Sequence, residues 1–464
     1  MPTPTLRFED GTITISDLGD AHALIAEQCV FDSRVARHRA RASNYAEIVR
    51  RLHGKTAYDD QAKKYRTLAL SEQAPRPMRP YQREAVDAWL AANKRGVVVL
   101  PTGAGKSYVA LKAILACQRS TLVLAPTIDL VQQWANDLSQ RLGCEVGQYG
   151  GGEKSLRDVT VSTYDSAVLI MPWHGDKFGL LICDECHHLP AGVTSGAAEQ
   201  CLAPFRLGLT ATPERADGMH ARLDELLGAQ VYRTEIDQLE GSFLSSYQAE
   251  IVHVELEPDE LAAYQENRKQ YLAFVRRQGI DFGAPDGWAR FIAVSGRDPE
   301  GRAAMRAYRE QKRLSRTSRG KLRAVWHLLR DHAGERCLVF TEDNDTAYEI
   351  GRRFILPVLT HHTKGAERKA MLGCFRSGTL PVLVTSKVLN EGVDVPEASV
   401  GIVVSGSGSV REHVQRLGRI LRPGVGKVAV LYEILSAGTG EQWTSDRRRA
   451  HVAFGADQEQ EWSP

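Results

Sequence analysis

The sequence predicts an α/β protein with two parallel-sheet domains in tandem, a small α+β domain before them, and a mostly helical insertion between them. Five short β-rich runs fall between residues 96 and 212, and helical patterns separate most of them. Similar runs return between residues 335 and 435, again with helical spacers. Runs that are apolar on both faces and alternate with helices are typical of a parallel sheet covered on both sides. The repeated layout indicates two lobes.

Five segments follow one another along the chain. Near the start, LRFEDGTITI places Asp10-Gly11 between alternating apolar and polar residues, which predicts a β-hairpin. The Pro-rich stretch QAPRPMRP is interpreted as the linker into the first lobe. The insertion contains helical patterns such as PDELAAYQENRKQYLAFVRR. The predicted boundaries are 1–78 for the N-terminal domain, 79–235 for the first lobe, 236–320 for the insertion, 321–440 for the second lobe and 441–464 for the tail.

Composition places the chain among ordinary globular proteins. Of its 464 residues, 43% are hydrophobic and 25% are charged, which is typical of soluble domains. No window approaches the ~18 uninterrupted apolar residues of a membrane-spanning helix. The start MPTPTLRFEDG lacks the pattern of an export signal, and the eight scattered cysteines predict no disulfide framework. We therefore expect a cytoplasmic protein without a membrane partner, associated with the nucleoid if its source is a prokaryote.

Positive charge is unevenly distributed, although the net charge is only +2. Residues 268–323 hold fifteen Lys and Arg against five Asp and Glu. A second basic cluster lies at residues 31–55, in FDSRVARHRARASNYAEIVRRLHGK. Such blocks are typical of surfaces that face a polyanion such as nucleic acid, but a solvated helix face gives the same pattern. Composition alone leaves both interpretations open.

A glycine-rich turn opens the first lobe in GVVVLPTGAGKSYVALKAIL, a predicted strand, turn and helix. In this context the backbone N–H groups of the turn and the start of the helix can wrap phosphate oxygens. Lys106 is predicted to neutralise the β- and γ-phosphates of ATP, and the Ser107 hydroxyl to bind Mg²⁺. Leu100 stands where the general pattern has its first glycine. The residues predicted to cradle the nucleotide are Thr102, Gly103, Ala104, Gly105, Lys106 and Ser107.

The stretch LLICDECHHLP offers two different chemistries. Cys183, Cys186 and His187 form a C-x-x-C-H string, as in haem attachment, whereas Asp184 and Glu185 suit a nucleotide hydrolase. Haem attachment belongs to exported proteins, and zinc needs further ligands for which no candidate pair is evident. The acids follow a predicted strand, at the end where open α/β sheets bind ligands. We therefore predict that Asp184 binds Mg²⁺ and that Glu185 orients or deprotonates water.

Several arginines lie near the end of the second lobe, in VREHVQRLGRILRPG. Arg419 and Arg422 are three residues apart, so on a helix they share one face. Arginines delivered from the far lobe stabilise transition-state charge at the γ-phosphate and make hydrolysis depend on lobe closure. A basic surface helix is the alternative interpretation. Together with the phosphate turn and the acids, the pattern predicts that Gln415, Arg419 and Arg422 complete the catalytic site.

Six motifs stand in the order found in superfamily 2 helicases and translocases: PTGAGKS, APTIDLVQQW, DECH, LTATP, SKVLNEGVDVP and QRLGRILR. The chain resembles this family over residues 79–425, and the resemblance implies two tandem RecA-like domains. DECH is similar to the DEAD/DEAH motif, and the family typically lacks the first glycine of the phosphate turn. The resemblance also implies that Arg79 and Gln82 contact adenine, and that Gly392 and Asp394 touch the nucleotide from the second lobe.

Further roles follow from the same resemblance. Thr210 and Thr212 in LTATP are implied to couple hydrolysis to movement of the lobes. Family members hold a nucleic-acid strand through short motifs that here read APT, STY and VTSK. Small hydroxyl side chains suit contacts to phosphates, which position a strand without reading its sequence. The implied strand contacts are Thr127, Thr163, Thr385 and Ser386.

Within the superfamily, the chain is most similar to XPB-type DNA helicases, including their archaeal and bacterial members. The likeness rests on RPYQREAV, on the insertion between the lobes and on FDSRVARHRARASNYAEIV, which resembles their damage-recognition domain. That family has an Arg-Glu-Asp motif after LTATP. Here Arg215-Ala216-Asp217 lacks the glutamate, which puts efficient strand melting in doubt but not ATP hydrolysis. The insertion stands where the family places its thumb, and its basic residues suit a DNA grip. The residues predicted to contact DNA here are Arg215, Asp217, Arg313, Arg316 and Arg319.

The leading hypothesis is a DNA-dependent ATPase that uses ATP and Mg²⁺, moves 3′→5′ and separates strands, in DNA repair or related DNA processing. The polarity is implied only by the XPB resemblance. A double-stranded DNA translocase of a restriction or defence system is a second interpretation, and an RNA helicase is a third. No nuclease constellation is evident, so we expect a partner nuclease or repair factor. A non-hydrolysing, ATP-switched binding module is disfavoured by Lys106, Glu185 and Arg422.

Overall fold

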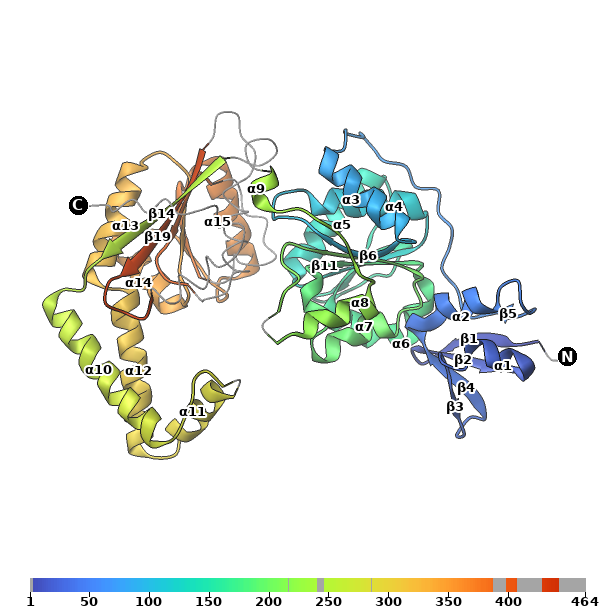
Figure 1. Cartoon of the computed structure of the whole chain (residues 1–464). Helices are drawn as coiled ribbons and strands as arrows, with labels where there is room; N and C mark the ends of the chain where they lie inside the picture. The colour runs from blue at the N-terminus through green and yellow to red at the C-terminus, as the bar shows by residue number, and fades with distance from the viewer. Residues whose placement is uncertain are drawn as a thin grey trace. The chain divides into compact units, whose positions relative to one another are not determined.

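The structure, a computed structural model, consists of two compact units, one ending at Gln238 and the other beginning at Leu239 (Figure 1). Each unit is built around a parallel sheet, so the predicted α/β class with two tandem sheets is confirmed. Among the described helices, none combines the length and apolar character needed to cross a membrane. The predicted tail lies outside the described residues, apart from its first position. The described residues are 3–215, 217–239, 246–284, 286–386, 398–406 and 428–441.

The N-terminal domain is a five-stranded sheet with two short helices. Its elements are β1 (Thr5–Glu9), β2 (Thr12–Ser16), α1 (His22–Ile25), β3 (Val30–Asp32), β4 (Arg37–Arg41), α2 (Tyr45–Leu52) and β5 (Asp59–Asp60). The strand order is β3-β4-β2-β1-β5. β1 and β2 form the predicted hairpin, and Asp10 and Gly11 take φ angles of 50° and 72°, as a two-residue turn requires. Leu6, Ile13 and Ile48 are fully buried in the core of this domain.

This small domain docks onto the first lobe within the same unit. The Gly11 N–H donates a 3.1 Å hydrogen bond to the Pro172 carbonyl of the lobe. The left-handed φ at Gly11 favours glycine, and a Cβ there would lie 2.7 Å from Gln200 Oε1, so the glutamine side chain would have to shift. Lys64 also pairs with the buried Asp176 at 2.7 Å. The contact therefore combines backbone fit with a partly buried ion pair.

The first lobe has an eight-stranded sheet in the order β13-β6-β12-β11-β7-β10-β8-β9, parallel except for the β8–β9 pair. Its strands are β6 (Arg95–Val99), β7 (Thr121–Ala125), β8 (Gly147–Gly150), β9 (Glu153–Lys154), β10 (Val159–Thr163), β11 (Leu180–Asp184), β12 (Phe205–Thr210) and β13 (Gln230–Arg233). Its helices are α3 (Pro80–Ala91), α4 (Lys106–Cys117), α5 (Ile128–Leu142), α6 (Tyr164–His174), α7 (Gly196–Glu199) and α8 (Leu223–Leu226). All five runs expected from the sequence are strands. Their apolar side chains are buried because helices cover both faces.

The second lobe has a six-stranded parallel sheet in the order β14-β19-β18-β15-β17-β16. Its elements are β14 (Ser246–Val254), α13 (Arg319–Asp331), β15 (Cys337–Phe340), α14 (Asn344–Phe354), β16 (Val358–Leu359), α15 (Gly365–Ser377), β17 (Val382–Thr385), β18 (Val400–Val403) and β19 (Val428–Ser436). The short helix α9 (Ile236–Leu239) stands where the first unit ends and the second begins. β14 falls inside the segment that the sequence predicts as the helical insertion. It instead pairs with β19 along nine positions and forms the edge of this sheet.

The helical part of the insertion projects from the second lobe (Figure 1). It consists of α10 (Pro258–Arg277), α11 (Gly287–Ser295) and α12 (Pro299–Arg316). α10 and α12 pack side by side, and α11 lies at their far end. The bundle has an apolar core of its own, which includes Tyr271, Phe274 and Phe291. We call these three helices the thumb helices.

Candidate nucleotide-hydrolysis site

The phosphate turn joins β6 to α4, which begins at Lys106. Gly103 and Gly105 have φ angles of 84° and 81°, a left-handed conformation that favours glycine. A Cβ on Gly105 would lie 2.6 Å from Gln82 Nε2 and would displace the amide that donates to the Ala104 carbonyl. The predicted turn therefore has the backbone geometry that brings N–H groups to a phosphate.

Side chains at the start of α3 form hydrogen bonds with the phosphate turn. The Tyr81 hydroxyl and the Gln82 side-chain amide each donate a 2.9 Å hydrogen bond to the Ala104 carbonyl. Gln82 Oε1 accepts a hydrogen bond from the Arg79 N–H at 3.1 Å, and the Arg79 guanidinium donates to the Tyr81 hydroxyl at 3.0 Å. Arg79 and Gln82 thus lie beside the turn. Tyr81 was not among the predicted site residues, although it stands between them in RPYQ.

The structure brings the predicted lysine and the predicted acid together. Lys106 Nζ lies 3.5 Å from Glu185 Oε1, and both side chains are nearly buried, with 11% and 13% exposed. Lys106 also donates to the Leu100 carbonyl at 3.4 Å. Glu185 directly follows β11 and has a φ angle of 47°, which is unusual for a residue other than glycine. The backbone here is held in a strained conformation, a feature that is concentrated at functional sites.

Asp184 is the buried member of the acid pair, with 7% of its surface exposed. The Trp134 indole N–H donates to Asp184 Oδ2 at 2.8 Å, and the Glu185 N–H donates to Oδ1 at 3.1 Å. The Tyr164 hydroxyl donates to the Asp184 backbone carbonyl at 2.7 Å. Burial, followed by the negative charge of Glu185, raises the pKa of Asp184 to about 6. Trp134 and Tyr164 are site residues that the motif reading did not single out.

A chain of contacts runs from Glu185 to the loop after β12. The Thr210 hydroxyl donates to Glu185 Oε2 at 3.3 Å, and the buried His187 Nδ1 lies 3.0 Å from the same hydroxyl. The Arg215 guanidinium donates to the His187 carbonyl at 2.7 Å. Arg215 also forms a bidentate ion pair with Asp217, at 2.9 and 2.6 Å. The predicted catalytic acid, Glu185, is thereby connected to Arg215 and Asp217, the predicted DNA-contacting pair.

The residues present fit a nucleotide with its magnesium ion. Thr102 Oγ1 is buried and has no hydrogen-bond partner among the described residues, as expected of a group that faces a ligand. One hydroxyl, one carboxylate and phosphate oxygens form the oxygen-rich donor set that Mg²⁺ prefers, and Ser107 and Asp184 would supply the protein's share. Within the described ranges, no three His, Cys, Asp or Glu side chains gather as a metal cluster.

The two thiols of the DECH segment lie inside the hydrophobic core. Cys183 and Cys186 are fully buried and pack in the core cluster of the first lobe. Burial is the largest effect on both thiols and raises the pKa of each well above its usual range. An apolar, protonated thiol of this kind is typical of a packing residue.

Two of the predicted strand contacts begin helices of the first lobe. Thr127 and Thr163 are the N-cap residues of α5 and α6, and their hydroxyls accept backbone N–H groups at 3.3 and 3.2 Å. In the second lobe, Thr385 is fully buried at the end of β17 and Ser386 is 3% exposed. Their roles in holding a strand remain predictions.

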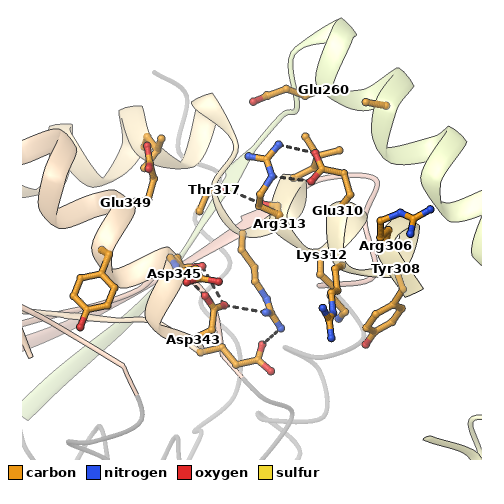
Figure 2. Close-up of a pocket in the computed structure, with 18 of the residues that line it drawn as sticks. Glu260, Arg306, Tyr308, Glu310, Lys312, Arg313, Thr317, Asp343, Asp345 and Glu349 are labelled. Carbon is orange, nitrogen blue, oxygen red and sulfur yellow. Dashed lines mark hydrogen bonds and ion pairs between the residues drawn. The ribbon is translucent and has the colours of Figure 1, made fainter. Parts of the chain in front are cut away.

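The arginines predicted to bind DNA beside the insertion, Arg313 and Arg316 of α12 and Arg319 of α13, line a groove of about 1690 Å³ (Figure 2). Each is already paired: Arg313 with Glu310 at 2.7 Å, Arg316 with Glu342 and with Asp343 at 2.9 Å, and Arg319 with Asp259 and Glu260. Three exposed arginines of the same groove have no carboxylate partner among the described residues. They are Arg306, Arg309 and Arg353.

Several predicted residues cannot be placed in the site. Gln415, Arg419 and Arg422 of the second lobe lie outside the described residues, as do Gly392 and Asp394. Ala216, the middle residue of the Arg-Ala-Asp sequence, is outside them as well.

Three segments match known protein families. Residues 6–62 match the damage recognition domain of the Xeroderma pigmentosum group B helicase. Residues 76–215 match the res subunit of type III restriction enzymes, and residues 320–424 match the helicase conserved C-terminal domain. In order along the chain, the three matches correspond to the predicted N-terminal domain, the first lobe and the second lobe.

Whole-chain comparisons give the same result. The chain is 42% identical over 372 residues to the DNA 3′-5′ translocase XPB2 of Sulfurisphaera tokodaii, covering 80% of this chain and 84% of that protein. It is 33% identical over 389 residues to the DNA 3′-5′ helicase XPB of Kineococcus radiotolerans, covering 81% of this chain but 63% of that protein. The Hef helicase domain of Pyrococcus furiosus has the same fold, with a TM-score of 0.50, 19% identity, and coverage of 80% of this chain and 98% of that one.

Proposed function

The chain belongs to the XPB family of ATP-dependent DNA helicases and translocases, and we propose that it is a DNA-stimulated ATPase that moves 3′→5′ along DNA. The observation that carries this proposal is the Lys106–Glu185 pair beside the buried Asp184, at the C-terminal edge of the first sheet. Burying charges costs free energy, and groups of nearly buried charges are concentrated at functional sites, so their presence at this edge supports hydrolytic chemistry.

Each group at this edge has a separate task in the proposed reaction. Bound ATP and Mg²⁺ supply the reacting phosphate and the positive charge that offsets its developing charge. Ser107 and Asp184 would hold the metal ion, and the Lys106 ammonium would contact the β- and γ-phosphates. Glu185 would orient the attacking water and accept its proton. Arg79 and Gln82 lie beside the phosphate turn, where they would hold the adenine end.

The second lobe is proposed to complete the site. By their place in the motifs, Gly392 and Asp394 would touch the nucleotide, and Gln415, Arg419 and Arg422 would stabilise transition-state charge. Hydrolysis would then require the two lobes to close, and movement along DNA would follow from repeated closing and opening.

The DNA strand is proposed to contact the first lobe at Thr127 and Thr163, where helix N-termini offer N–H groups to phosphates. Thr385 and Ser386 are proposed as the corresponding contacts of the second lobe. Arg215 and Asp217 would act beside them. Arg313 and Arg316 of α12 and Arg319 of α13 are proposed as further contacts, with the groove that they line as the DNA-facing surface.

Translocation without strand separation is a second candidate, which the Arg215-Ala216-Asp217 sequence favours. The family motif has glutamate where this chain has alanine, and XPB2 of Sulfurisphaera tokodaii carries the name of a translocase. A partner nuclease or repair factor, with DNA repair as the setting, is part of the proposal for either activity.

Phosphate release measured with single-stranded, duplex and forked DNA and with RNA tests the proposal. We expect DNA to stimulate turnover and RNA to do so less. Strand displacement on duplexes with 3′ or 5′ tails then separates helicase from translocase, because only a helicase of the proposed polarity separates the 3′-tailed duplex. An ATPase that ignores DNA would overturn the proposal.

A further inference from the structure

Three separate elements of the first lobe converge on the DECH segment, and each begins near a residue proposed to contact DNA. α5 contributes Trp134, α6 contributes Tyr164, and the loop after β12 contributes Arg215. None of these three side chains belongs to the phosphate turn, whose own lysine, Lys106, contacts Glu185. Their shared target is the short stretch that carries Asp184 and Glu185.

α5 links its N-cap to the magnesium-binding carboxylate through one rigid element. Thr127 caps the helix, and Trp134 lies seven residues later on the same helix, 5% exposed, with its indole N–H 2.8 Å from Asp184 Oδ2. Seven residues make nearly two turns, so the cap and the indole lie on one face, ~10 Å apart along the axis. Any shift of α5 when a strand binds at its N-terminus therefore moves the donor that holds Asp184.

α6 makes the corresponding link over a shorter path. Tyr164 immediately follows the N-cap Thr163, is 3% exposed, and donates its hydroxyl hydrogen to the Asp184 carbonyl at 2.7 Å. One element thus holds the side chain of Asp184 and the other holds its backbone.

The third contact holds the segment from its far end. Arg215 donates to the His187 carbonyl at 2.7 Å, and its bidentate pair with Asp217 fixes the direction of the guanidinium. The His187 ring lies 3.0 Å from the Thr210 hydroxyl, which donates to Glu185. Asp184 and Glu185 are thus fixed at both ends by side chains from elements proposed to contact DNA.

We propose that Trp134 and Tyr164 are positioning residues that couple DNA bound at the N-termini of α5 and α6 to the placement of Asp184, and so to Mg²⁺-nucleotide binding. This inference rests on the proposed DNA-stimulated ATPase activity. It attributes that stimulation to movement of α5 and α6, transmitted through the hydrogen bonds of Trp134 and Tyr164 to Asp184. Arg215 supports the same segment through the His187 carbonyl. Because coupling between two ligands is reciprocal, the same residues also make Mg²⁺-nucleotide strengthen DNA binding.

The test uses conservative variants that remove one donor and little volume. Trp134→Phe removes the indole N–H, and Tyr164→Phe removes only the hydroxyl. Trp89→Phe and Tyr45→Phe are matched controls, because Trp89 donates to the Arg206 carbonyl and Tyr45 to Asp60, and neither acceptor belongs to the DECH segment. All four are compared by circular dichroism and thermal melting before use. Tyr164→Phe, the mildest change, carries the test if the tryptophan variant does not fold.

The first readout is binding, without turnover. The dissociation constant of labelled single-stranded DNA is measured with and without Mg²⁺ and a non-hydrolysable ATP analogue, and the ratio gives the coupling. A wild-type ratio of about 5–150 is typical of such coupling. We expect each test variant to reduce this ratio about fivefold or more, as the loss of a hydrogen bond to a charged or buried group allows. The controls keep the wild-type ratio.

The second readout is the Mg²⁺ dependence of binding a fluorescent ATP analogue. Trp134→Phe should raise the half-saturating Mg²⁺ concentration by on the order of tenfold, because the carboxylate loses its charge-assisted donor. The two proposals fail in different ways. A wild-type protein without DNA-stimulated turnover would refute the proposed function. A wild-type protein that couples DNA to nucleotide, with Trp134→Phe and Tyr164→Phe variants that couple equally well, would refute only this inference.

Discussion

The acid end of β11 and the thumb helices both concentrate charge, but they surround it differently. At β11, Lys106, Asp184 and Glu185 are nearly buried, and neutral donors such as the Trp134 indole hold them in place. In the groove beside the thumb helices, Arg313 of α12 and Arg319 of α13 are more exposed, with 60% and 47% of their side chains open to solvent. There the partners are carboxylates of the same surface.

The comparison shows why motifs and charge counts differ in value. A charge that is removed from water must be compensated by fixed contacts, so buried charges at a strand end indicate chemistry. An exposed arginine and a neighbouring carboxylate offset each other's charge. The number of arginines therefore overstates the positive charge that a polyanion would meet. Fifteen basic residues in a segment therefore say less about binding than one lysine in a glycine-rich turn.

The largest effect is expected for the nearly buried charges at the end of β11. Lys106→Ala and Glu185→Gln should each lower kcat by about 10³-fold or more, because one removes phosphate contact and the other the group that activates water. A filter-binding assay for ATP should separate them, with affinity lost mainly in Lys106→Ala. Full turnover in Glu185→Gln would show that this acid is not the water-activating group.

Asp184→Asn tests the cost of burying a charge. A carboxyl whose pKa is raised from 3.8 to about 6 on folding destabilises the folded state as the pH rises, and the penalty is complete above that value. The variant should be inactive because it lacks the carboxylate proposed to bind Mg²⁺. Its nucleotide-free form should nevertheless be more stable than wild type at neutral pH by about 1–3 kcal/mol, because the buried charge is removed. Melting curves without Mg²⁺ measure this.

The pH dependence provides the control for that prediction. Below about pH 4 the wild-type carboxyl is protonated in both the folded and unfolded chain, so the advantage of the variant should disappear there. An advantage of the same size at both pH values would mean that packing, and not the buried charge, causes the difference.

Much of the fold and of this site could be predicted from the sequence, because the signals are local. Apolar runs predict the strands, and a glycine turn between strand and helix predicts the position of Lys106. The contacts of Trp134 and Tyr164 with Asp184 could not be predicted in this way, because the indole is fifty positions away along the chain and only tertiary packing brings it near. β14 was missed for a similar reason, since its pairing partner β19 follows at the other end of the lobe.

The sequence was least informative about the thumb helices. Counting charges cannot reveal that Arg316 meets Glu342 and Asp343, which lie beyond the predicted insertion in the second lobe. The bounds of the long helix α10 nevertheless agree with the sequence pattern, because proline and acidic residues begin the helix and arginines end it. Local signals again succeeded where long-range pairing was not involved.

A smaller effect should distinguish the groove arginines that have a carboxylate partner from those that have none among the described residues. Replacing Arg306 and Arg309 by Glu should weaken DNA binding by about tenfold at low salt and flatten its salt dependence, because unpaired cations release counterions from DNA. The matched replacement of Arg313 and Arg319 should have a weaker effect, since their carboxylates already offset them. Fluorescence anisotropy at several salt concentrations measures both. Equal losses would mean that DNA displaces the carboxylates.

The smallest effect is expected from the thiol that lies next to the catalytic acids. Cys186 is fully buried, and its sulfur would lie 3.1 Å from a Cβ placed on Gly208, so it fills the space over β12. Cys186→Ala should leave the steady-state ATPase rate within about twofold of wild type and lower stability by about 1 kcal/mol, the cost of a small cavity. Turnover that depends on this thiol, or iron or zinc bound in stoichiometric amount by the purified protein, would contradict the assignment of chemistry to the acids alone. In that case the buried thiols at the end of β11, and not only the buried acids, would take part in the chemistry.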